Sequence, residues 1–180
     1  MRWSRPSFGA VLCVSLLASC TQSTIQASRS HYDQGLQHYR AGRLANAIGE
    51  YREAIRLNPR SAEAHNELGM ALYQVGDRDA AIEEYRLALQ FKPEYAEAHN
   101  NLGVALLSAG QIVFAVSEYR HAVALRPDLA QAQYNLCLGL ELLGQFQEAL
   151  GHCQRAAQQA PQLAGLADAI LRLQGKLAGQ

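Results

Sequence analysis

The chain of 180 residues has the length of one domain, and its hydrophobic content of 49% is sufficient for a core. Its 16 basic residues balance its 16 acidic residues, so no basic surface predicts a nucleic-acid partner. Without residues 1–19 the chain would carry 14 basic against 16 acidic residues, a net charge of −2.

The chain begins with the features of an exported lipoprotein. Arg2 and Arg5 precede an apolar run, residues 8–18, that is too short for a transmembrane helix. The run ends in Leu-Ala-Ser followed by Cys20, which resembles the lipobox of bacterial lipoproteins. That resemblance implies a signal peptide over residues 1–19, a diacylglycerol on the Cys20 thiol, and a lipid anchor and tether over residues 20–27. The alternative is an ordinary secretory signal that happens to contain a cysteine.

The residue after Cys20 bears on the destination of such a lipoprotein. In bacterial lipoproteins an aspartate at this position retains the protein in the inner membrane, and here the residue is Thr21. In an organism with two membranes we therefore expect an outer-membrane lipoprotein that faces the periplasm. A fully extended tether over residues 21–27 would span at most about 25 Å.

A pattern of 34 residues repeats four times without a gap, over residues 28–61, 62–95, 96–129 and 130–163. The eighth place of each unit holds Gly35, Gly69, Gly103 and Cys137, and the twenty-fourth holds Tyr51, Tyr85, Tyr119 and Cys153. Glycine at place 15 predicts a tight turn between two helices, and proline at place 32 ends the second helix. Small residues at places 8, 20 and 27 allow the two helices to approach closely.

This pattern resembles the tetratricopeptide repeat family, and the resemblance covers about three quarters of the chain. It implies an all-α fold, a right-handed superhelical solenoid of four helix-turn-helix repeats with a concave inner surface. We expect helices over residues 31–41, 44–57, 65–75, 79–91, 99–109 and 112–125, followed by the two helices of the fourth unit. Gln34 replaces the leucine expected at place 7, which indicates that the first unit is the more exposed end.

Residues 164–180 predict a capping helix with a frayed end. Leu166, Ile170, Leu173 and Leu177 fall on one helical face, and charged residues lie elsewhere. Such a helix would close the last apolar surface of the solenoid.

Cys137 and Cys153 occupy places 8 and 24 of the fourth unit, on helices that share one seam. An oxidising periplasm favours a disulfide between them, which requires Cα atoms within about 7 Å. Two separate buried thiols are the alternative.

The residue pattern does not predict an enzyme, a metal site or a cofactor. No nucleophile elbow, phosphate-binding loop, His-Glu-x-x-His sequence or paired-cysteine motif occurs. His31, His65 and His99 recur at place 4 only because the unit repeats, and we interpret them as half-buried structural residues. Glu83 and Glu84 are expected on a solvated face of their helix.

The family resemblance places the binding surface on the concave wall, at places 2, 5, 6, 9, 12 and 13 of the first helix of each unit. Tyrosine offers large contact area, and asparagine can donate to and accept from a peptide backbone. The candidate groove residues are Tyr32, Tyr39, Asn66, Met70, Tyr73, Asn100, Asn101, Tyr134 and Asn135. The alternative is that these polar residues are only tolerated at the surface. The basic residues with which chaperone-binding relatives clamp a C-terminal carboxylate are absent from places 5 and 9.

These features predict a lipid-anchored, non-enzymatic scaffold that binds a peptide or helix of a protein partner during assembly of the cell envelope. The chain is weakly similar to the tetratricopeptide lipoproteins that assist type IV or Tad pilus and secretin assembly. Two alternatives are an adaptor for cell-wall hydrolases and a structural solenoid that self-associates through its ends without binding a peptide.

Overall fold

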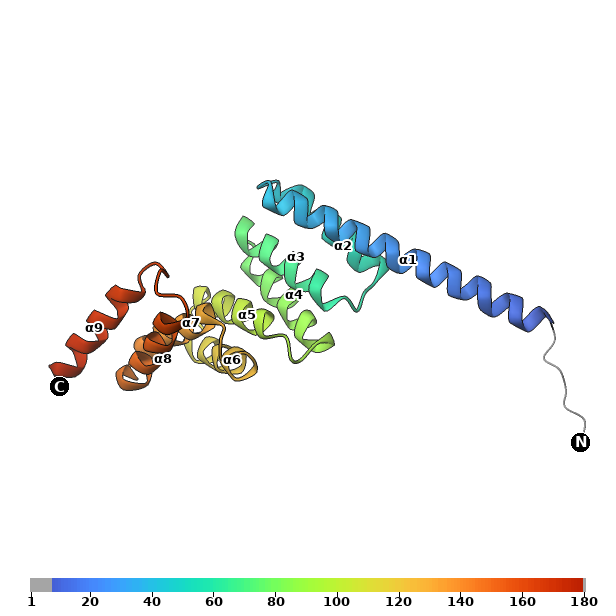
Figure 1. Ribbon diagram of the computed structural model, residues 1–180. Coiled ribbons are helices and arrows are strands. Elements are labelled where there is room, and N and C mark those ends of the chain that lie inside the picture. Colours follow the sequence, from blue (N-terminus) through green and yellow to red (C-terminus); the bar gives the residue numbers. More distant parts are fainter. Residues whose placement is uncertain (1–7, 180) are drawn as a thin grey trace, which may run out of the picture.

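The structure is a computed structural model that describes the backbone of residues 8–179 and the side chains of residues 22–179. The described residues form only helices: α1 (Phe8–Arg40), α2 (Leu44–Leu57), α3 (Ala62–Val75), α4 (Arg78–Phe91), α5 (Ala96–Ser108), α6 (Ile112–Leu125), α7 (Ala130–Leu142), α8 (Phe146–Gln159) and α9 (Leu166–Ala178). Four helix pairs stack in chain order, and α9 follows the last pair (Figure 1). The predicted all-α solenoid with a terminal helix is confirmed.

A glycine in the left-handed conformation joins the two helices of each repeat. Gly76, for example, has φ of 95°, and the following N–H, that of Asp77, donates to the carbonyl of Leu72 at 3.0 Å. This arrangement satisfies carbonyls at the end of α3 that have no partner within the helix. Only glycine adopts such a φ without strain, so the chain reverses direction at the same place in each unit.

At the centre of the core of each of the first three repeats, a tyrosine ring of the second helix packs against a glycine of the first helix. A methyl group added at Gly103 would lie 2.5 Å from a ring carbon of Tyr119, and the pairs Gly35/Tyr51 and Gly69/Tyr85 are equally close. The alanines at places 20 and 27 are completely buried around these rings. Helix separation is therefore set by the glycine, because any side chain there would push the ring away.

In the fourth repeat a disulfide stands between the two helices, at the places where the other repeats have glycine and tyrosine. Cys137 and Cys153 have Cα atoms 5.4 Å apart and form a disulfide between α7 and α8. Both side chains are fully buried. The bond therefore takes the place of the contact between glycine and tyrosine.

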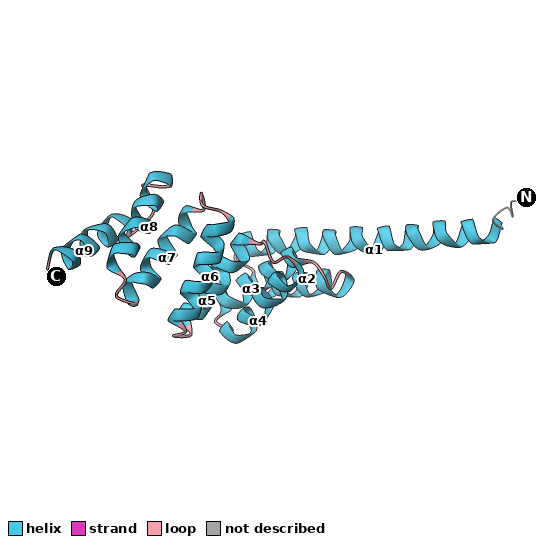
Figure 2. Cartoon of the chain, turned by 90° about the horizontal axis from the view of Figure 1, so that it is seen from below, coloured by secondary structure: helices cyan, strands magenta, loops and turns pink. Residues whose placement is uncertain are grey.

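Helix α1 is much longer than the helix predicted to begin at residue 31 (Figure 2). It begins at Phe8 and includes residues 20–27, because neither glycine nor proline interrupts residues 10–34. Its contact with α2 includes a hydrogen bond from the buried hydroxyl of Ser28 to the carbonyl of Ala54 at 2.8 Å. None of the described helices has a segment long and apolar enough to span a membrane. Residues 1–7 of the predicted signal peptide and the side chains up to residue 21, that of Cys20 included, lie outside what the structure describes, so lipidation stays a prediction.

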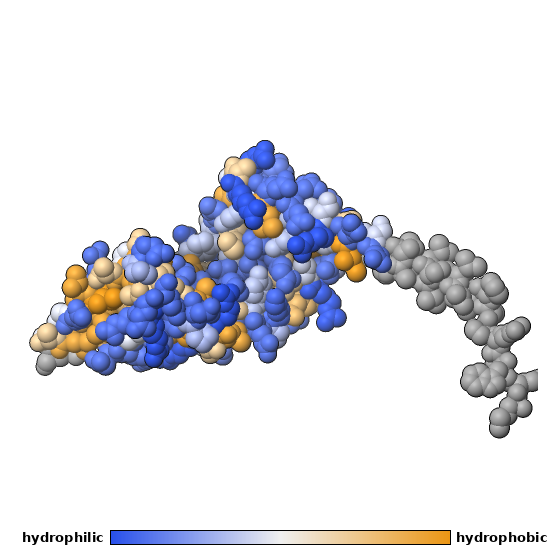
Figure 3. Space-filling model, viewed as in Figure 1, coloured by the Kyte–Doolittle hydropathy of each residue, from blue (hydrophilic) through white to orange (hydrophobic). Residues whose placement is uncertain are grey.

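Helix α9 packs one apolar face on the fourth repeat and leaves a second apolar residue uncovered. Leu166 and Leu173 are buried, as predicted for a capping helix. Leu171 lies on the opposite side and is 67% exposed. Hydrophobic surface gathers at this C-terminal end of the molecule (left in Figure 3). The cap is therefore less polar on its outer side than the sequence pattern predicts.

Candidate peptide-binding groove

The first helices of the pairs form the inner wall of the superhelix. α1, α3, α5, α7 and α9 each contact the next helix of this set, whereas among the described residues α2, α4, α6 and α8 contact only helices adjacent in the chain. A curved stack brings together the helices on its inner side. Side chains at places 5, 6, 9, 12 and 13 of the inner helices therefore line the concave face.

Asparagines link neighbouring repeats across this wall. The Asn101 amide donates to Oδ1 of Asn66 at 3.0 Å, and the Asn135 amide donates to Oδ1 of Asn100 at 2.8 Å. Asn66 and Asn100 are only 2% and 8% exposed, so their main contribution is to join repeats. Asn101 and Asn135 are half-buried, and each amide retains a second N–H for a ligand.

A hollow of about 240 Å³ opens on the concave face between the first three repeats. Its lining is rich in aromatic and apolar side chains: Tyr39, Met70, Tyr73, Gln74, Tyr85, Asn101 and Val104. Four of the nine predicted groove residues thus meet in one place. Tyr85 is buried at the base, whereas Tyr39, Met70 and Tyr73 are half-exposed. The arrangement can bury one apolar or amphipathic side chain of a partner and hydrogen-bond its backbone.

The C-terminal half of the groove is apolar with a charged rim. Leu107, Leu138 and Leu142 line a second hollow of about 390 Å³ together with Glu141, Arg172 and Lys176. The Arg172 guanidinium donates to both oxygens of Glu141 at 2.8 Å, and the Lys176 ammonium donates to Oε1 at 2.8 Å. The hydrogen bonds from Arg172, followed by the one from Lys176, lower the pKa of Glu141 to about 2. The two cations at the C-terminal end are thus paired with a carboxylate of α7.

Besides the asparagines Asn66, Asn100 and Asn135, two predicted groove tyrosines lie away from both hollows. The Tyr32 ring packs against Tyr51 with centroids 6.1 Å apart, and the Arg29 guanidinium lies 5.3 Å from the Tyr32 ring centroid. The Tyr134 hydroxyl lies so close to Gly165 that a methyl group there would be 2.7 Å away. Tyr134 therefore supports the turn into α9.

Comparison with known proteins agrees with this geometry. A family model described as tetratricopeptide repeat matches residues 32–96 and 71–130, which together exceed half of the chain. The chain belongs to the tetratricopeptide repeat family. A search of curated proteins gives no match.

Solved structures of other tetratricopeptide repeat proteins share the fold. PilF of Pseudomonas aeruginosa superposes with a TM-score of 0.79 at 23% identity, covering 87% of this chain and 72% of that one. MamA of Desulfovibrio magneticus RS-1 gives 0.75 at 21% identity, covering 84% and 86%. YrrB, described as a TPR protein with an unusual peptide-binding site, gives 0.71 at 19% identity, covering 83% and 77%.

The first three tetratricopeptide units each pair a histidine at place 4 with a glutamate at place 23, and in the first unit Nδ1 of His31 lies 2.7 Å from Glu50. In the second and third units the histidine also contacts a proline carbonyl. Nδ1 of His65 lies 2.6 Å from Glu84 and Nε2 lies 3.1 Å from the Pro59 carbonyl; His99 repeats both contacts. A carbonyl and a carboxylate only accept hydrogen bonds, so a histidine that bonds to both donates from both nitrogens and is protonated. Glu84 is therefore part of an internal ion pair, and its predicted placement on a solvated face is wrong.

The fourth repeat makes the same contacts with the residue types exchanged. Gln133 takes the histidine's place and donates to the Pro127 carbonyl at 3.0 Å. Its side-chain oxygen accepts from Nδ1 of His152 at 2.7 Å. Burial, with the charge of Arg155, lowers the pKa of His152, so this version of the contact is uncharged.

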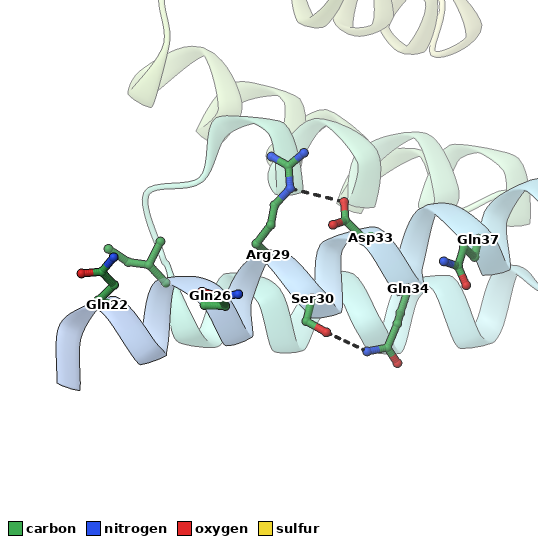
Figure 4. A pocket seen from close by; sticks show the side chains of 8 residues that line it. Gln22, Gln26, Arg29, Ser30, Asp33, Gln34 and Gln37 are labelled. Atoms are coloured by element: carbon green, nitrogen blue, oxygen red, sulfur yellow. Dashed lines mark hydrogen bonds and ion pairs between the residues drawn. The ribbon is translucent and has the colours of Figure 1, made fainter. Parts of the chain in front are cut away.

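The outward face of α1 carries mostly polar side chains, with Ile25 exposed among them, where a preceding repeat would pack. Figure 4 shows glutamines along this face, with Gln34 donating to Ser30 at 3.2 Å and Arg29 paired with Asp33 at 3.3 Å. A shallow hollow follows these side chains. Gln34 is exposed, which explains why glutamine stands at a place that is leucine in the three later units.

Within residues 22–179, no group of three histidine, cysteine or carboxylate side chains could hold a metal ion. The sequence pattern did not single out several groove residues: Glu67, Val104, Leu107, Leu138 and Leu142. They stand at groove places, so their position was available in the sequence. They were missed because they are apolar or acidic, whereas tyrosine and asparagine are the residue types that predict a peptide-binding surface.

Proposed function

We propose that this tetratricopeptide scaffold is anchored to a bacterial membrane by a lipid on Cys20 and binds a segment of a protein partner in its concave groove. The hollow between Tyr39 and Tyr73 is the observation that carries this proposal. It joins half-exposed rings to an asparagine that still has a free N–H, a combination that suits a peptide.

The groove can be tested without disturbing the stack. Substituting Asn101 or Asn135 would leave a buried asparagine oxygen without its donor, which costs about 1–3 kcal/mol. The double variant Tyr39→Ala/Tyr73→Ala removes the two half-exposed rings and keeps the asparagine links. Partner recovery in affinity capture from envelope extracts, quantified by mass spectrometry, should fall at least about tenfold with helicity unchanged.

Val113→Ala is the matched control, because Val113 is exposed at the start of α6, on the outer row of helices. Equal recovery with the wild type and the Tyr39→Ala/Tyr73→Ala variant would remove the groove from the proposal.

The membrane anchor has a separate test. The lipobox resemblance supports acylation of Cys20, so Cys20→Ser should abolish incorporation of labelled palmitate and release the protein from the membrane fraction. Retention of Cys20→Ser in membranes would contradict the anchor.

A role in envelope assembly rests on the predicted export signal and on the similarity in fold to PilF. We propose that the partner is a component of a pilus or secretin assembly. Deletion of the gene should then reduce heat-resistant secretin multimers on gels, and expression of the Tyr39→Ala/Tyr73→Ala variant should not restore them. Normal multimers after deletion would favour another envelope process.

One observation favours a second candidate, a solenoid that self-associates through its C-terminal end. Leu171 on α9 is 67% exposed, and Leu142 at the end of α7 is 60% exposed. Leu171 lies on the last helix of the stack, where a further helix would continue the repeat pattern, and Leu142 extends the exposed apolar surface into the adjoining hollow.

A further inference from the structure

A carboxylate that forms no ion pair with any described side chain lies beside the tyrosines of the concave face. Glu67 stands at place 6 of α3, one turn before Met70 and two turns before Gln74, both of which line the hollow between the first three repeats. It is half-buried. Among residues 22–179 its one hydrogen bond is from the Asn66 amide, which donates to Oε1 at 3.2 Å.

Three cations of the first three repeats already have carboxylate partners. Arg29 pairs with Asp33, Lys92 with Glu63, and Arg126 with Glu97. Burial raises the pKa of Glu67, whereas the hydrogen bond from Asn66 and then the charge of Arg40, an exposed residue at the end of α1, act in the opposite direction. Glu67 is therefore a groove carboxylate whose second oxygen is available to a ligand, and a bound cation would favour its ionised form.

Hydrogen bonds fix the orientation of this carboxylate. Asn101 donates to Asn66, and the other end of the Asn66 amide donates to Glu67. Asn66 is almost fully buried, so the relay holds Oε1 and leaves Oε2 free. A preorganised acceptor of this kind binds a cation without first giving up a protein partner.

Several tyrosines lie within the electrostatic reach of Glu67. Burial raises the pKa of Tyr39 and Tyr85, and the charge of Glu67 raises it further. Burial and then Glu67 act in the same way on Tyr32, Tyr51 and Tyr95. Aromatic rings next to a carboxylate are an environment that favours an organic cation, because the ring faces and the carboxylate both attract positive charge.

We infer that Glu67, with Tyr39 and Tyr73 of the adjoining hollow, is a binding site for a lysine or arginine side chain of the partner segment. The partner's ammonium or guanidinium donates to Oε2 of Glu67, and its alkyl stem packs on Met70 and the tyrosine rings. This inference rests on the proposed groove function and adds the charge of the residue that the groove selects.

Short peptides can test the site directly. The probes are acetyl-Ala-Lys-Ala-amide and its norleucine analogue, which has a similar stem and no charge. Met70 is one of two methionines in the chain, so ¹³C-methyl labelling of methionine in the full-length protein gives a reporter inside the hollow. The lysine probe should shift the Met70 methyl signal with an affinity about tenfold higher than that of the norleucine probe.

Variants separate the charge from the rings. Glu67→Gln should weaken the lysine probe about tenfold and leave the norleucine probe unchanged. Tyr39→Leu should weaken the lysine probe several-fold, whereas Tyr39→Phe, which keeps the ring, should not. Glu83→Gln is the control, since Glu83 is exposed on α4 and pairs with Arg86.

Equal affinity for the two probes, or an unchanged affinity in Glu67→Gln, would overturn the cation site while a shift of Met70 still supports a peptide groove. No shift with either probe would also overturn it, and the groove would then be judged by partner capture with the Tyr39→Ala/Tyr73→Ala variant. The two proposals therefore fail by different measurements.

Discussion

The histidine–glutamate pairs make the stability of single repeats depend on protonation. Burial alone lowers the pKa of His65, but the hydrogen bonds to Glu84 and the Pro59 carbonyl, with the charge of Glu84, outweigh it and raise the pKa above 6.5. The balance is the same for His99 with Glu118 and Pro93. A folded-state pKa above the unfolded value means that the folded protein binds the proton more tightly.

The stabilisation from these pairs should be fully present below pH 6.5 and be lost as the pH rises through the raised pKa values. The midpoint of urea unfolding, followed by circular dichroism, should therefore fall on passing from pH 6 to pH 9. The double variant His65→Gln/Glu84→His copies the uncharged contact of Gln133 and His152, so it should show a shallower decline. The same slope in both proteins would contradict the assignment of a protonated His65.

A second residue-scale prediction concerns the glycine at the repeat seam. A methyl group at Gly69 would lie 2.7 Å from the Tyr85 ring, so Gly69→Ala should cost about 2 kcal/mol of unfolding free energy through overpacking. Gly49 lies within α2 with no atom near its added methyl group. Gly49→Ala should instead stabilise by about 0.5–1 kcal/mol. Urea unfolding of the two variants provides the comparison, and equal effects would refute the packing argument.

At the scale of the element, the disulfide should make the fourth repeat dependent on redox state. The bond closes a segment with a sequence separation of 16, for which loop-closure entropy predicts a stabilisation of about 3 kcal/mol. The variant Cys137→Ala/Cys153→Ala should speed amide hydrogen exchange in α7 and α8 more than in α3 and α4. The variant Cys137→Gly/Cys153→Tyr restores the seam of the other repeats and should recover part of the protection.

Uniformly faster exchange along the whole stack would show instead that the solenoid unfolds as one unit.

Most elements could be predicted from the sequence because the repeat fixes them locally. Glycine at place 15 and proline at place 32 mark where helices end, and α2 and α6 begin and end at the predicted residues. The start of α1 could not be predicted in this way, because residues 10–34 contain no residue that breaks a helix. Where local signals are absent, the boundary depends on packing and on neighbouring helical segments.

The groove was harder to predict than the helices. Place numbers identify its wall, and Tyr39, Met70, Tyr73 and Asn101 do meet there. They do not reveal which polar residues are consumed by contacts between repeats: Asn66 is buried by its bond with Asn101. Whether two side chains of neighbouring repeats form such a hydrogen bond depends on the distance between the repeats. The residue type at a single place does not reveal that distance.

At the scale of the whole molecule, the two ends of the solenoid differ in chemistry. The α1 end carries a row of glutamines around one exposed apolar residue, Ile25, whereas the α9 end exposes Leu171 next to the apolar surface of the last repeat. If the protein self-associates, the C-terminal end should provide the contact, and Leu171→Lys should shift a dimer to monomer in sedimentation velocity. Gln34→Lys is the control at the other end. A monomer at all accessible concentrations of wild-type protein would remove self-association.

Continuity of α1 through residues 20–27 also determines which way the groove faces. An α-helix turns by about 100° and advances about 1.5 Å with each residue. One residue added to this segment would therefore rotate the four repeats by nearly a third of a turn about the α1 axis, whereas seven residues, close to two turns, would almost restore the original direction. If the protein is attached at Cys20, the length of this segment therefore sets the direction in which the groove faces. Each added residue would turn the groove by about 100° but move it along the helix axis by only about 1.5 Å.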